Sequence, residues 1–224
     1  VTVDDKGVIR SCVIDSVPAT VSFNATGTIT SDITAAVPTK NELGPDYGMV
    51  AWGNAIAEWN EQVAALASYA VGKTVEELKN GAIDESGKAP AGSDLASSAT
   101  IYLGGYVSAI EAAAANAKHL GAQAGDELVL TTLNSVKNST SATADAAGNA
   151  QLDADITAVT RKGGVVTSCI IDSVQAKIAF DATGAVTTNL SVPVQTKNEL
   201  GENYGMVAWG NAIAEWNEQA AAFA

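Results

Sequence analysis

Four residue types that can bind a ligand recur at the same spacing in two parts of this chain. They are a lysine, a glutamate, a tyrosine and a tryptophan, found as Lys40, Glu42, Tyr47 and Trp52 and again as Lys197, Glu199, Tyr204 and Trp209. A lysine beside a glutamate can bind an anion and orient it, and an indole ring can stack on a flat ligand. The sequence therefore predicts that these eight residues bind a small molecule or a partner protein.

The same lysine and glutamate positions also have a structural interpretation. Thr39 and Glu42 have the spacing of a capping box, so Lys40 and Glu42 can instead belong to a capped helical turn with a surface ion pair. Tyr47 and Gly48 stand where the chain enters a helix, and free N–H groups there can take up a carboxylate or phosphate. Every helix start offers such groups, so this signal is weak.

Other catalytic and metal-binding chemistry finds no support in the residues. Asp15 and Asp172 lie beside Ser16 and Ser173, but the chain has one histidine, His119, which is outside the repeats. A Ser-His-Asp triad is therefore excluded, and no pair of acidic residues stands out for glycoside hydrolysis. One histidine and two cysteines also leave almost no ligands for a transition metal.

Composition limits the class of partner and the compartment. A net charge of −13 with only 12 Lys and Arg gives no basic run that could replace the counterions of a nucleic acid, so no nucleic acid partner is expected. Ala, Ser, Thr and Gly dominate, as in many secreted or surface proteins. No signal peptide or lipobox is present, so an exported form would have lost its leader.

A long internal repeat organises the chain. The block Thr39–Ala65 returns at Thr196–Ala222, offset by 157 residues, with 24 of 27 positions identical. The preceding stretch, Gly7–Pro38, aligns with residues 164–195 but exchanges one aliphatic residue for another, as a sheet face tolerates. The identity of the block indicates either a shared recognition surface or a recent copying event.

Turn and strand signals predict an antiparallel meander in each copy. We expect strands at Val8–Val17, Ala19–Phe23 and Thr28–Val37, with a type I turn at Asn24–Gly27. Two further strands, at Glu127–Val136 and Ala150–Thr160, are expected to pair ahead of the second copy. The cysteines, Cys12 and Cys169, are repeat equivalents within strands, so buried thiols are expected unless the sheets bring them together.

Helical periodicity begins at residue 49. One apolar stripe predicts an amphipathic helix with both tryptophans of each block in the core: Met49, Trp52, Ile56, Trp59, Val63 and Leu66. Stacking of the tryptophans on a ligand is the alternative. Thr74 and Glu77 open a short helix that we expect to end at Asn80-Gly81, and Leu103–Leu120 predicts a further helix ending at Gly121.

These elements predict an α+β fold of two repeated units, each an antiparallel β-meander packed against an amphipathic helix. We place the first unit with its helical extension at residues 1–125 and the second, C-terminally shorter unit at residues 126–224.

Several phrases of the sequence resemble a known group of proteins. TKNELGPDYGM, AIAEWNEQ, YAVGKTVEELKNGAID and DLASSATIYLGGYVSAIEAAAANAK are similar to repeat-containing extracytoplasmic lipoproteins of Gram-positive gut anaerobes, over nearly all of the chain. The resemblance implies a protein outside the cytoplasm that touches the membrane only through a lipid anchor.

That group is distantly similar to the FMN-binding domain family, in which a small-residue loop ending in Ala-Thr precedes a helix. The resemblance implies that Ser97, Ser98, Ala99 and Thr100 form this loop and that the Thr100 hydroxyl carries FMN through a phosphoester bond. The alternative is that the four residues only turn the chain into the helix.

Two functions follow from these interpretations. The preferred one is a non-enzymatic cell-envelope lipoprotein that binds a ligand or partner through the surface shared by both blocks. The alternative is a flavoprotein carrying covalent FMN on Thr100 for extracytoplasmic electron transfer.

Overall fold

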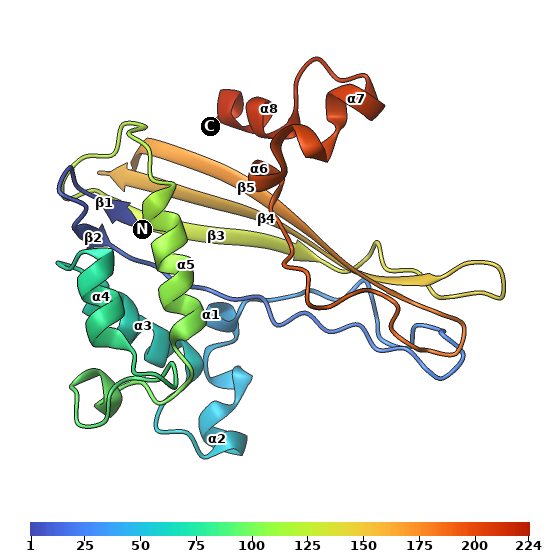
Figure 1. Cartoon of the computed structure of the whole chain (residues 1–224), viewed down its shortest axis with the longest axis horizontal. Helices are drawn as coiled ribbons and strands as arrows, with labels where there is room; N and C mark the ends of the chain where they lie inside the picture. Colours follow the sequence, from blue (N-terminus) through green and yellow to red (C-terminus); the bar gives the residue numbers. More distant parts are fainter. The chain divides into compact units, whose positions relative to one another are not determined.

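The computed structural model describes all residues, 1–224, as a mixed α/β protein with eight α-helices and two antiparallel sheets (Figure 1). The α-helices are α1 (Lys40–Leu43), α2 (Met49–Gly53), α3 (Trp59–Ala70), α4 (Val75–Ala82), α5 (Gly104–Ala115), α6 (Lys197–Leu200), α7 (Met206–Gly210) and α8 (Trp216–Phe223). Short 3-10 helices lie at Gly44–Tyr47, Leu95–Ser97 and Gly201–Tyr204. The strands are β1 (Thr2–Val3), β2 (Ile9–Ser11), β3 (Glu127–Ser135), β4 (Gly148–Lys162) and β5 (Val165–Phe180).

Packing divides the chain into two compact units whose segments alternate along the sequence. The first unit contains Val1–Ser16, Thr39–Leu130 and Ala158–Cys169. The second contains Val17–Pro38, Thr131–Thr157 and Ile170–Ala224. Each unit therefore holds one copy of the repeated block, and each is described by itself below.

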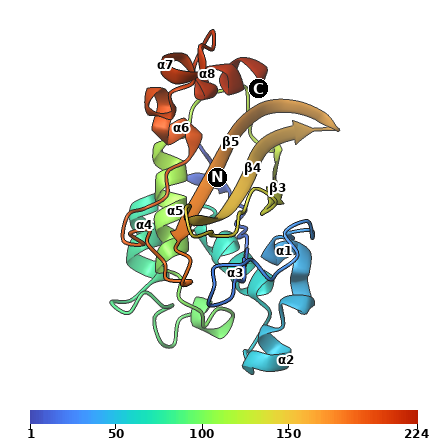
Figure 2. The same cartoon turned by 90° about the vertical axis from the view of Figure 1, so that its right-hand side faces the viewer.

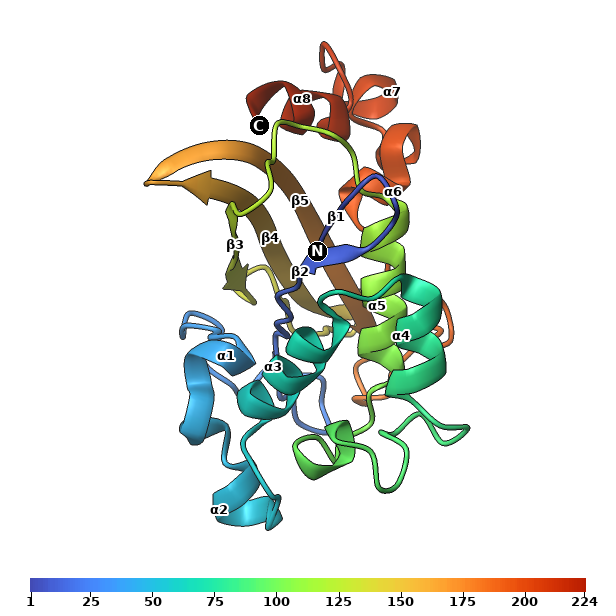
Figure 3. The ribbon, with the colours of Figure 1, turned by 90° about the vertical axis from the view of Figure 1, so that its left-hand side faces the viewer.

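The core of the first unit lies between α3, α4 and α5, which pack side by side (Figure 3). Its buried side chains are aliphatic and come from all three helices, from strand β2 and from the segment before α5: Ile9, Leu66, Ala70, Leu78, Ala82, Ala89, Leu95, Ala99, Leu103, Val107 and Ile110. Full burial of each Leu, Ile or Val stabilises the fold by about 1.5–3 kcal/mol. These residues therefore supply most of the driving force for folding this unit.

A buried glutamine joins α3 to the loop that precedes α5. Gln62 is completely buried, and its side-chain N–H donates to the carbonyl of Ala57 at 2.8 Å. Its amide oxygen accepts the backbone N–H groups of Thr100 at 2.8 Å and Ile101 at 3.2 Å. Because a buried polar group is costly when unpaired, these bonds fix the loop to the helix.

The second unit contains two matching turns and a stacked pair of rings. Asn24 accepts the N–H groups of Thr26 and Thr28 with its side-chain oxygen, and Asp181 makes the equivalent bonds to residues 183 and 185. The rings of Phe23 and Phe180 stack face to face with centroids 3.9 Å apart. The turn predicted at Asn24–Gly27 is confirmed, with Gly27 at φ +66°.

The two copies of the strand region differ. Residues 165–180 form one continuous strand, β5, in a sheet of order β3-β4-β5 (Figure 2). In the first copy, only Ile9–Ser11 is a strand, paired with β1, and Phe23 and Ile29 form an isolated bridge. The strands predicted at 127–136 and 150–160 are present, as β3 and β4, and β4 pairs with β5.

The predicted long helix after residue 49 is wrong. In each copy this segment forms two helices. The first helix, α2 or α7, ends at an asparagine in the left-handed conformation, Asn54 at φ 51° or Asn211 at φ 52°. An asparagine adopts this conformation more readily than most residues, and the αL turn redirects the chain. Consequently, Trp59 is buried as predicted, whereas Trp52 lies outside the core.

The capping boxes at Thr39–Glu42 and Thr74–Glu77 are confirmed. The predicted stop at Asn80-Gly81 is wrong, since α4 continues to Ala82. The helix predicted at 103–120 is shorter and ends at Ala115, where the N–H of Ala117 binds the carbonyl of Ala114 in a tighter turn and the Asn116 side chain donates to the carbonyl of Ala112 at 3.0 Å.

Both cysteines are free thiols in half-buried positions. Burial raises the pKa of the Cys12 thiol, which keeps it protonated at neutral pH. None of the helices is both long and apolar enough to cross a lipid bilayer.

The buried glutamine provides a matched test of the first unit. We expect Gln62→Ala to lower the free energy of unfolding by about 2–4 kcal/mol, because two backbone N–H groups lose their acceptor. Gln219→Ala, at the repeat equivalent, should change it by less than about 0.5 kcal/mol, because Gln219 is exposed. Chemical denaturation followed by circular dichroism measures both, and equal losses in the two variants would contradict this assignment.

Candidate functional site

One asparagine in each repeated block binds the segment that precedes the block. Asn41 donates its side-chain N–H to the carbonyl of Ile14 at 2.9 Å, and its backbone N–H binds the Asp15 carboxylate at 3.2 Å. In the second unit, Asn198 makes the same bonds to Ile171 at 3.0 Å and to Asp172 at 3.1 Å. The two aspartates considered for catalysis in the sequence are therefore structural acceptors that hold α1 and α6.

A buried carboxylate connects the two helices of each block. Glu58 precedes α3, and its two oxygens accept the backbone N–H groups of Met49 at 2.9 Å and Val50 at 3.1 Å. Glu215 makes the same pair of bonds to residues 206 and 207, at 2.9 Å and 3.0 Å. From the sequence, the N–H groups at the helix start beside Tyr47 and Gly48 could take up a carboxylate or phosphate. In the structure, the Glu58 carboxylate already binds them.

The lysine of each block lies against two aromatic rings. The Lys40 ammonium is 4.7 Å from the centroid of Tyr47 and 5.0 Å from that of Trp59. Lys197 is 5.0 Å from both Tyr204 and Trp216. Such cation–π contacts contribute about 0.5–2 kcal/mol. Each lysine therefore packs against two aromatic rings of its own block. Neither lysine forms an ion pair with the glutamate two residues later.

Glu42 and Glu199 complete the capping boxes. Their carboxylates accept the N–H groups of Thr39 at 2.7 Å and Thr196 at 2.8 Å. Tyr204 also donates its hydroxyl to the side-chain oxygen of Gln175 at 3.1 Å, a bond that Tyr47 lacks because Pro18 occupies the equivalent position.

Trp52 and Trp209 are presented to solvent in the same orientation. Each is 82 % exposed, and each ring lies against the glycine that starts its helix. A Cβ atom at Gly48 or Gly205 would overlap the six-membered ring of the tryptophan. Both glycines have φ near +80°, at 79° and 80°. Glycine is therefore required here twice, for the left-handed backbone and for the position of the ring.

Two aliphatic residues within four positions of each exposed tryptophan are exposed as well. Val50 and Ile56 are 47 % and 57 % exposed, and Val207 and Ile213 are 47 % and 99 % exposed. We call the group Val50, Trp52 and Ile56, and its repeat Val207, Trp209 and Ile213, the tryptophan knuckle. It is the largest departure of the blocks from a buried apolar face, and it is duplicated.

The eight predicted ligand residues therefore separate into two sets. Lysine and tyrosine are brought together with the second tryptophan of each block, and glutamate is used in capping. Trp52 and Trp209 are 82 % exposed, and Glu42 and Glu199 are exposed as well but are bonded within the caps. The sequence interpretation missed the clamps Glu58 and Glu215, although a glutamate followed three residues later by Glu61 or Glu218 is a capping-box signal.

Thr100 lies on the loop held by Gln62. Its side chain is exposed, Ala99 beside it is buried, and its hydroxyl is 3.4 Å from the Gln62 amide oxygen. The loop leads into α5 as the sequence predicted. The hydroxyl is therefore accessible on a loop whose backbone is fixed.

The surroundings of Thr100 fit an FMN phosphate poorly. The N–H groups of Ser98 and Ala99 bind the carbonyl of Leu95, and those of Thr100 and Ile101 bind Gln62. At the start of α5, the N–H groups of residues 103 and 104 both bind the carbonyl of Gly87. Because these donors are already paired within the protein, they cannot hold a phosphate, and we derive no chemistry through a flavin.

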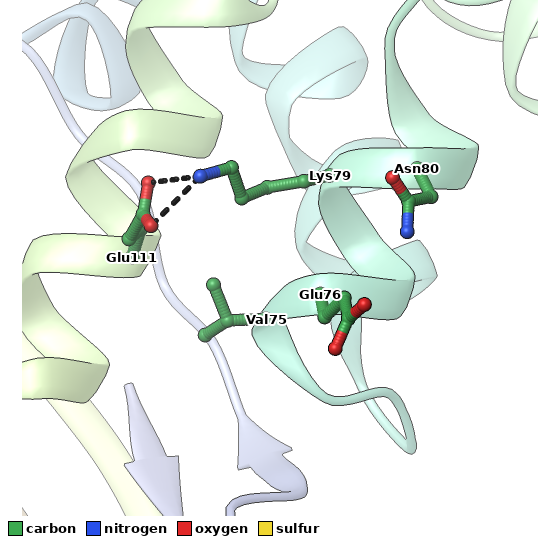
Figure 4. A pocket seen from close by; sticks show the side chains of 5 residues that line it. All are labelled: Val75, Glu76, Lys79, Asn80 and Glu111. Carbon is green, nitrogen blue, oxygen red and sulfur yellow. Dashed lines mark hydrogen bonds and ion pairs between the residues drawn. The ribbon is translucent and has the colours of Figure 1, made fainter.

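A shallow depression of about 350 Å³ lies between α4 and α5, lined by Val75, Glu76, Lys79, Asn80 and Glu111 (Figure 4). Lys79 and Glu111 form an ion pair across it at 2.8 Å, with both side chains about half exposed. A surface ion pair of this kind contributes little to stability. The depression contains no further convergent polar groups, and no cluster of three metal-ligating side chains is present in the chain.

Comparison with protein-family models, with curated proteins and with solved structures finds no match for this chain. The candidate site is therefore argued from geometry alone, and it consists of one tryptophan knuckle in each unit.

The glycine beneath the indole provides a test of this geometry. We expect Gly48→Ala to lower the free energy of unfolding by about 1–2 kcal/mol, because it places a Cβ on left-handed backbone, and to displace the Trp52 ring. Gly53→Ala is the control, since Gly53 has open space and no positive φ. Denaturation and acrylamide quenching of tryptophan fluorescence measure the two effects, and an unchanged G48A variant would show that the ring is not fixed in this way.

A second test concerns the Thr100 loop. We expect the protein isolated from its native cells to have the unmodified mass at Thr100, because the backbone N–H groups of residues 98–101 are already paired. Intact mass spectrometry with peptide mapping measures this. An added FMN residue on Thr100 would instead make the protein a flavin carrier.

Proposed function

We propose that this chain is a non-enzymatic binding protein of the cell envelope that engages a partner protein through its two tryptophan knuckles. The observation that carries the proposal is the identical presentation of Trp52 and Trp209, each 82 % exposed and each fixed on a glycine. Large exposed apolar groups on a soluble surface are typical of interaction sites, and tryptophan is enriched among residues that dominate binding energy.

The shape of the knuckle favours a protein over a small molecule. Sites for small molecules are concave and enclose most of the ligand, whereas a side chain with four fifths of its surface in solvent encloses nothing. The exposed valine and isoleucine near each tryptophan in the sequence add further apolar surface to the block. A projecting group of this kind fits into a pocket on the partner.

Fixed geometry supports the same proposal. The Glu58 clamp holds the start of α2, and the left-handed residues Gly48 and Asn54 determine the direction in which Trp52 projects. A preordered anchor loses little conformational freedom on binding, so more of its contact energy appears as affinity. The net charge of −13 further suits a partner with a basic surface around its pocket.

The location and the repeat organisation belong to this proposal. Resemblance to extracytoplasmic lipoproteins supports attachment to the membrane through a lipid anchor outside the described sequence. The near-identity of the blocks supports an origin in which each unit combined an antiparallel meander with the helical block.

Binding to envelope fractions of the source cells tests the proposal. Labelled protein is titrated in a pelleting assay, comparing wild type with Trp52→Ala, Trp209→Ala and the double variant. Loss of a buried tryptophan anchor costs at least about 2 kcal/mol, so we expect each single variant to bind about 30-fold more weakly per site, and the double variant to lose binding.

Leu133→Ala provides the control, because Leu133 is 75 % exposed and outside the knuckles. Protease treatment of the envelopes should abolish binding. Retention by protease-treated envelopes or by vesicles of extracted lipid would assign the surface to another partner class. Wild-type binding by the double variant would exclude the knuckles.

A further inference from the structure

Two segments of the second unit are repeat equivalents and contact each other. We call Val17–Pro38 the first arm and its equivalent, residues 174–195, the second arm. Phe23 of the first arm and Phe180 of the second arm occupy the same repeat position, 157 residues apart. Their rings stack with centroids 3.9 Å apart and with planes within 1° of parallel. Each arm therefore contacts the other through the same residue.

The turns of the two arms show the same reciprocity. A Cβ atom at Gly27 would lie 2.8 Å from the carbonyl oxygen of Asp181, and a Cβ atom at Gly184 would lie 3.0 Å from that of Asn24. Gly27 and Gly184 are repeat equivalents, as are Asn24 and Asp181, so the contact is the same in both directions. Reciprocal contacts of this kind form the self-complementary interfaces of symmetric dimers. The arms can therefore make the same contact between two chains as within one.

The base of the first arm is closed by hydrogen bonds within the first unit. Ser16 and Thr39, the residues on either side of the arm, both belong to that unit. The backbone N–H of Lys40 donates to the carbonyl of Ser16 at 2.8 Å, and the Asn41 side chain donates to the carbonyl of Ile14 at 2.9 Å. The arm can therefore change its partner while these bonds stay formed.

Proline stands near both ends of the first arm, and glutamine takes its place in the second arm. Pro18 and Pro38 correspond to Gln175 and Gln195. Because proline has no N–H, it cannot donate to a β-ladder. Residues 165–180 run as one strand, β5, through Gln175, whereas the segment around Pro18 belongs to no strand. Residues outside regular structure are those that absorb hinge motion, so both ends of the first arm suit a hinge.

Further partners of the first arm also lie in the second unit. The backbone N–H of Ala142 donates to the carbonyl of Gly27 at 2.8 Å, and that of Ile29 donates to the hydroxyl of Ser141 at 3.0 Å. A second copy of the chain has the same ring, donors and acceptors in its own second unit. Exchange of the first arm between two copies would therefore keep these contacts.

We propose that two copies of this chain exchange their first arms, so that Phe23 of each copy stacks on Phe180 of the other. Because the contacts are conserved, the main cost of exchange is the association entropy of two chains, which a high protein concentration offsets. Exchange is independent of the proposed function, because no knuckle residue lies in either arm. The exchanged dimer would carry four knuckles, two from each chain.

Complementary variants of the stacked pair test this exchange. One full chain carries Phe23→Val and Phe180→Val, and the other carries Phe23→Trp and Phe180→Trp. Within either chain the pair is too small or too large, and both errors are destabilising. Exchange between the two chains pairs valine with tryptophan at both sites, which is close to the volume of two phenylalanines.

The two chains are mixed in equal amounts, unfolded in urea, refolded together at high concentration and analysed by native mass spectrometry. We expect the heterodimer to exceed either homodimer by at least about tenfold, because the heterodimer alone has two matched pairs.

Two controls use the same substitutions. A single chain with Phe23→Val and Phe180→Trp has a matched pair within itself, and its Tm shows whether valine and tryptophan pack at this position. A mixture of Phe23→Val and Phe23→Trp chains gains nothing by exchange, because each new side chain meets Phe180 in either form. We expect this second mixture to give heterodimer only in the proportion of random pairing.

The wild-type chain provides a readout that needs no substitution. After refolding at high concentration, it should contain a dimer that persists on dilution, because the two copies separate only when both arms leave their partners. Refolding to monomer alone would overturn the proposal. An equal share of heterodimer in the matched and unmatched mixtures would also overturn it, since the dimer would then form through another surface.

Discussion

A buried carboxylate controls the geometry of both repeated blocks. Glu58 and Glu215 each bind the first two N–H groups of the helix that precedes them, although those helices are only five residues long. A helix of that length is unstable alone, because few of its groups are paired within it. The carboxylate replaces the missing partners, neutralises the helix dipole and ties α2 to α3. Everything projecting from α2 depends on this bond.

The bonding pattern also gives the near-identity of the blocks a physical basis. Asparagine holds the strand, threonine and glutamate cap the first turn, lysine fills the space between two rings, and glycine accommodates an indole. Few of these positions accept another residue type without loss of a bond. The strand region before the block has no such network, and conservative aliphatic exchanges there leave its packing possible. The different rates of divergence in the two parts of the repeat therefore do not require a recent copying event.

Local signals in the sequence were reliable where the interaction is itself local. The capping boxes, the Asn24–Gly27 turn and the strands β3 and β4 could be predicted, because each depends on residues a few positions apart or on simple alternation.

The break at Asn54 could not be predicted from the spacing of apolar residues. Trp52 and Trp59 are seven residues apart and share a stripe in a continuous helix, but an αL residue between them places one inside and one outside. Nor could the sequence show that the two similar strand segments differ in pairing, since pairing depends on whether a partner strand such as β4 is adjacent. For the candidate site, the sequence could not show that lysine and tyrosine pack against the second tryptophan of each block while Trp52 and Trp209 stay exposed, because this depends on the fold.

The contact between glycine and indole has an evolutionary consequence. Position 48 can accept a side chain only if the ring at position 52 moves, and the ring keeps its place only while position 48 has no Cβ. Position 48 therefore cannot gain a side chain unless the ring at position 52 moves, whereas position 52 can lose its indole without any clash at position 48. Since positions 205 and 209 are linked in the same way, the protein carries two such pairs, and a lineage could lose one while the other remains under selection.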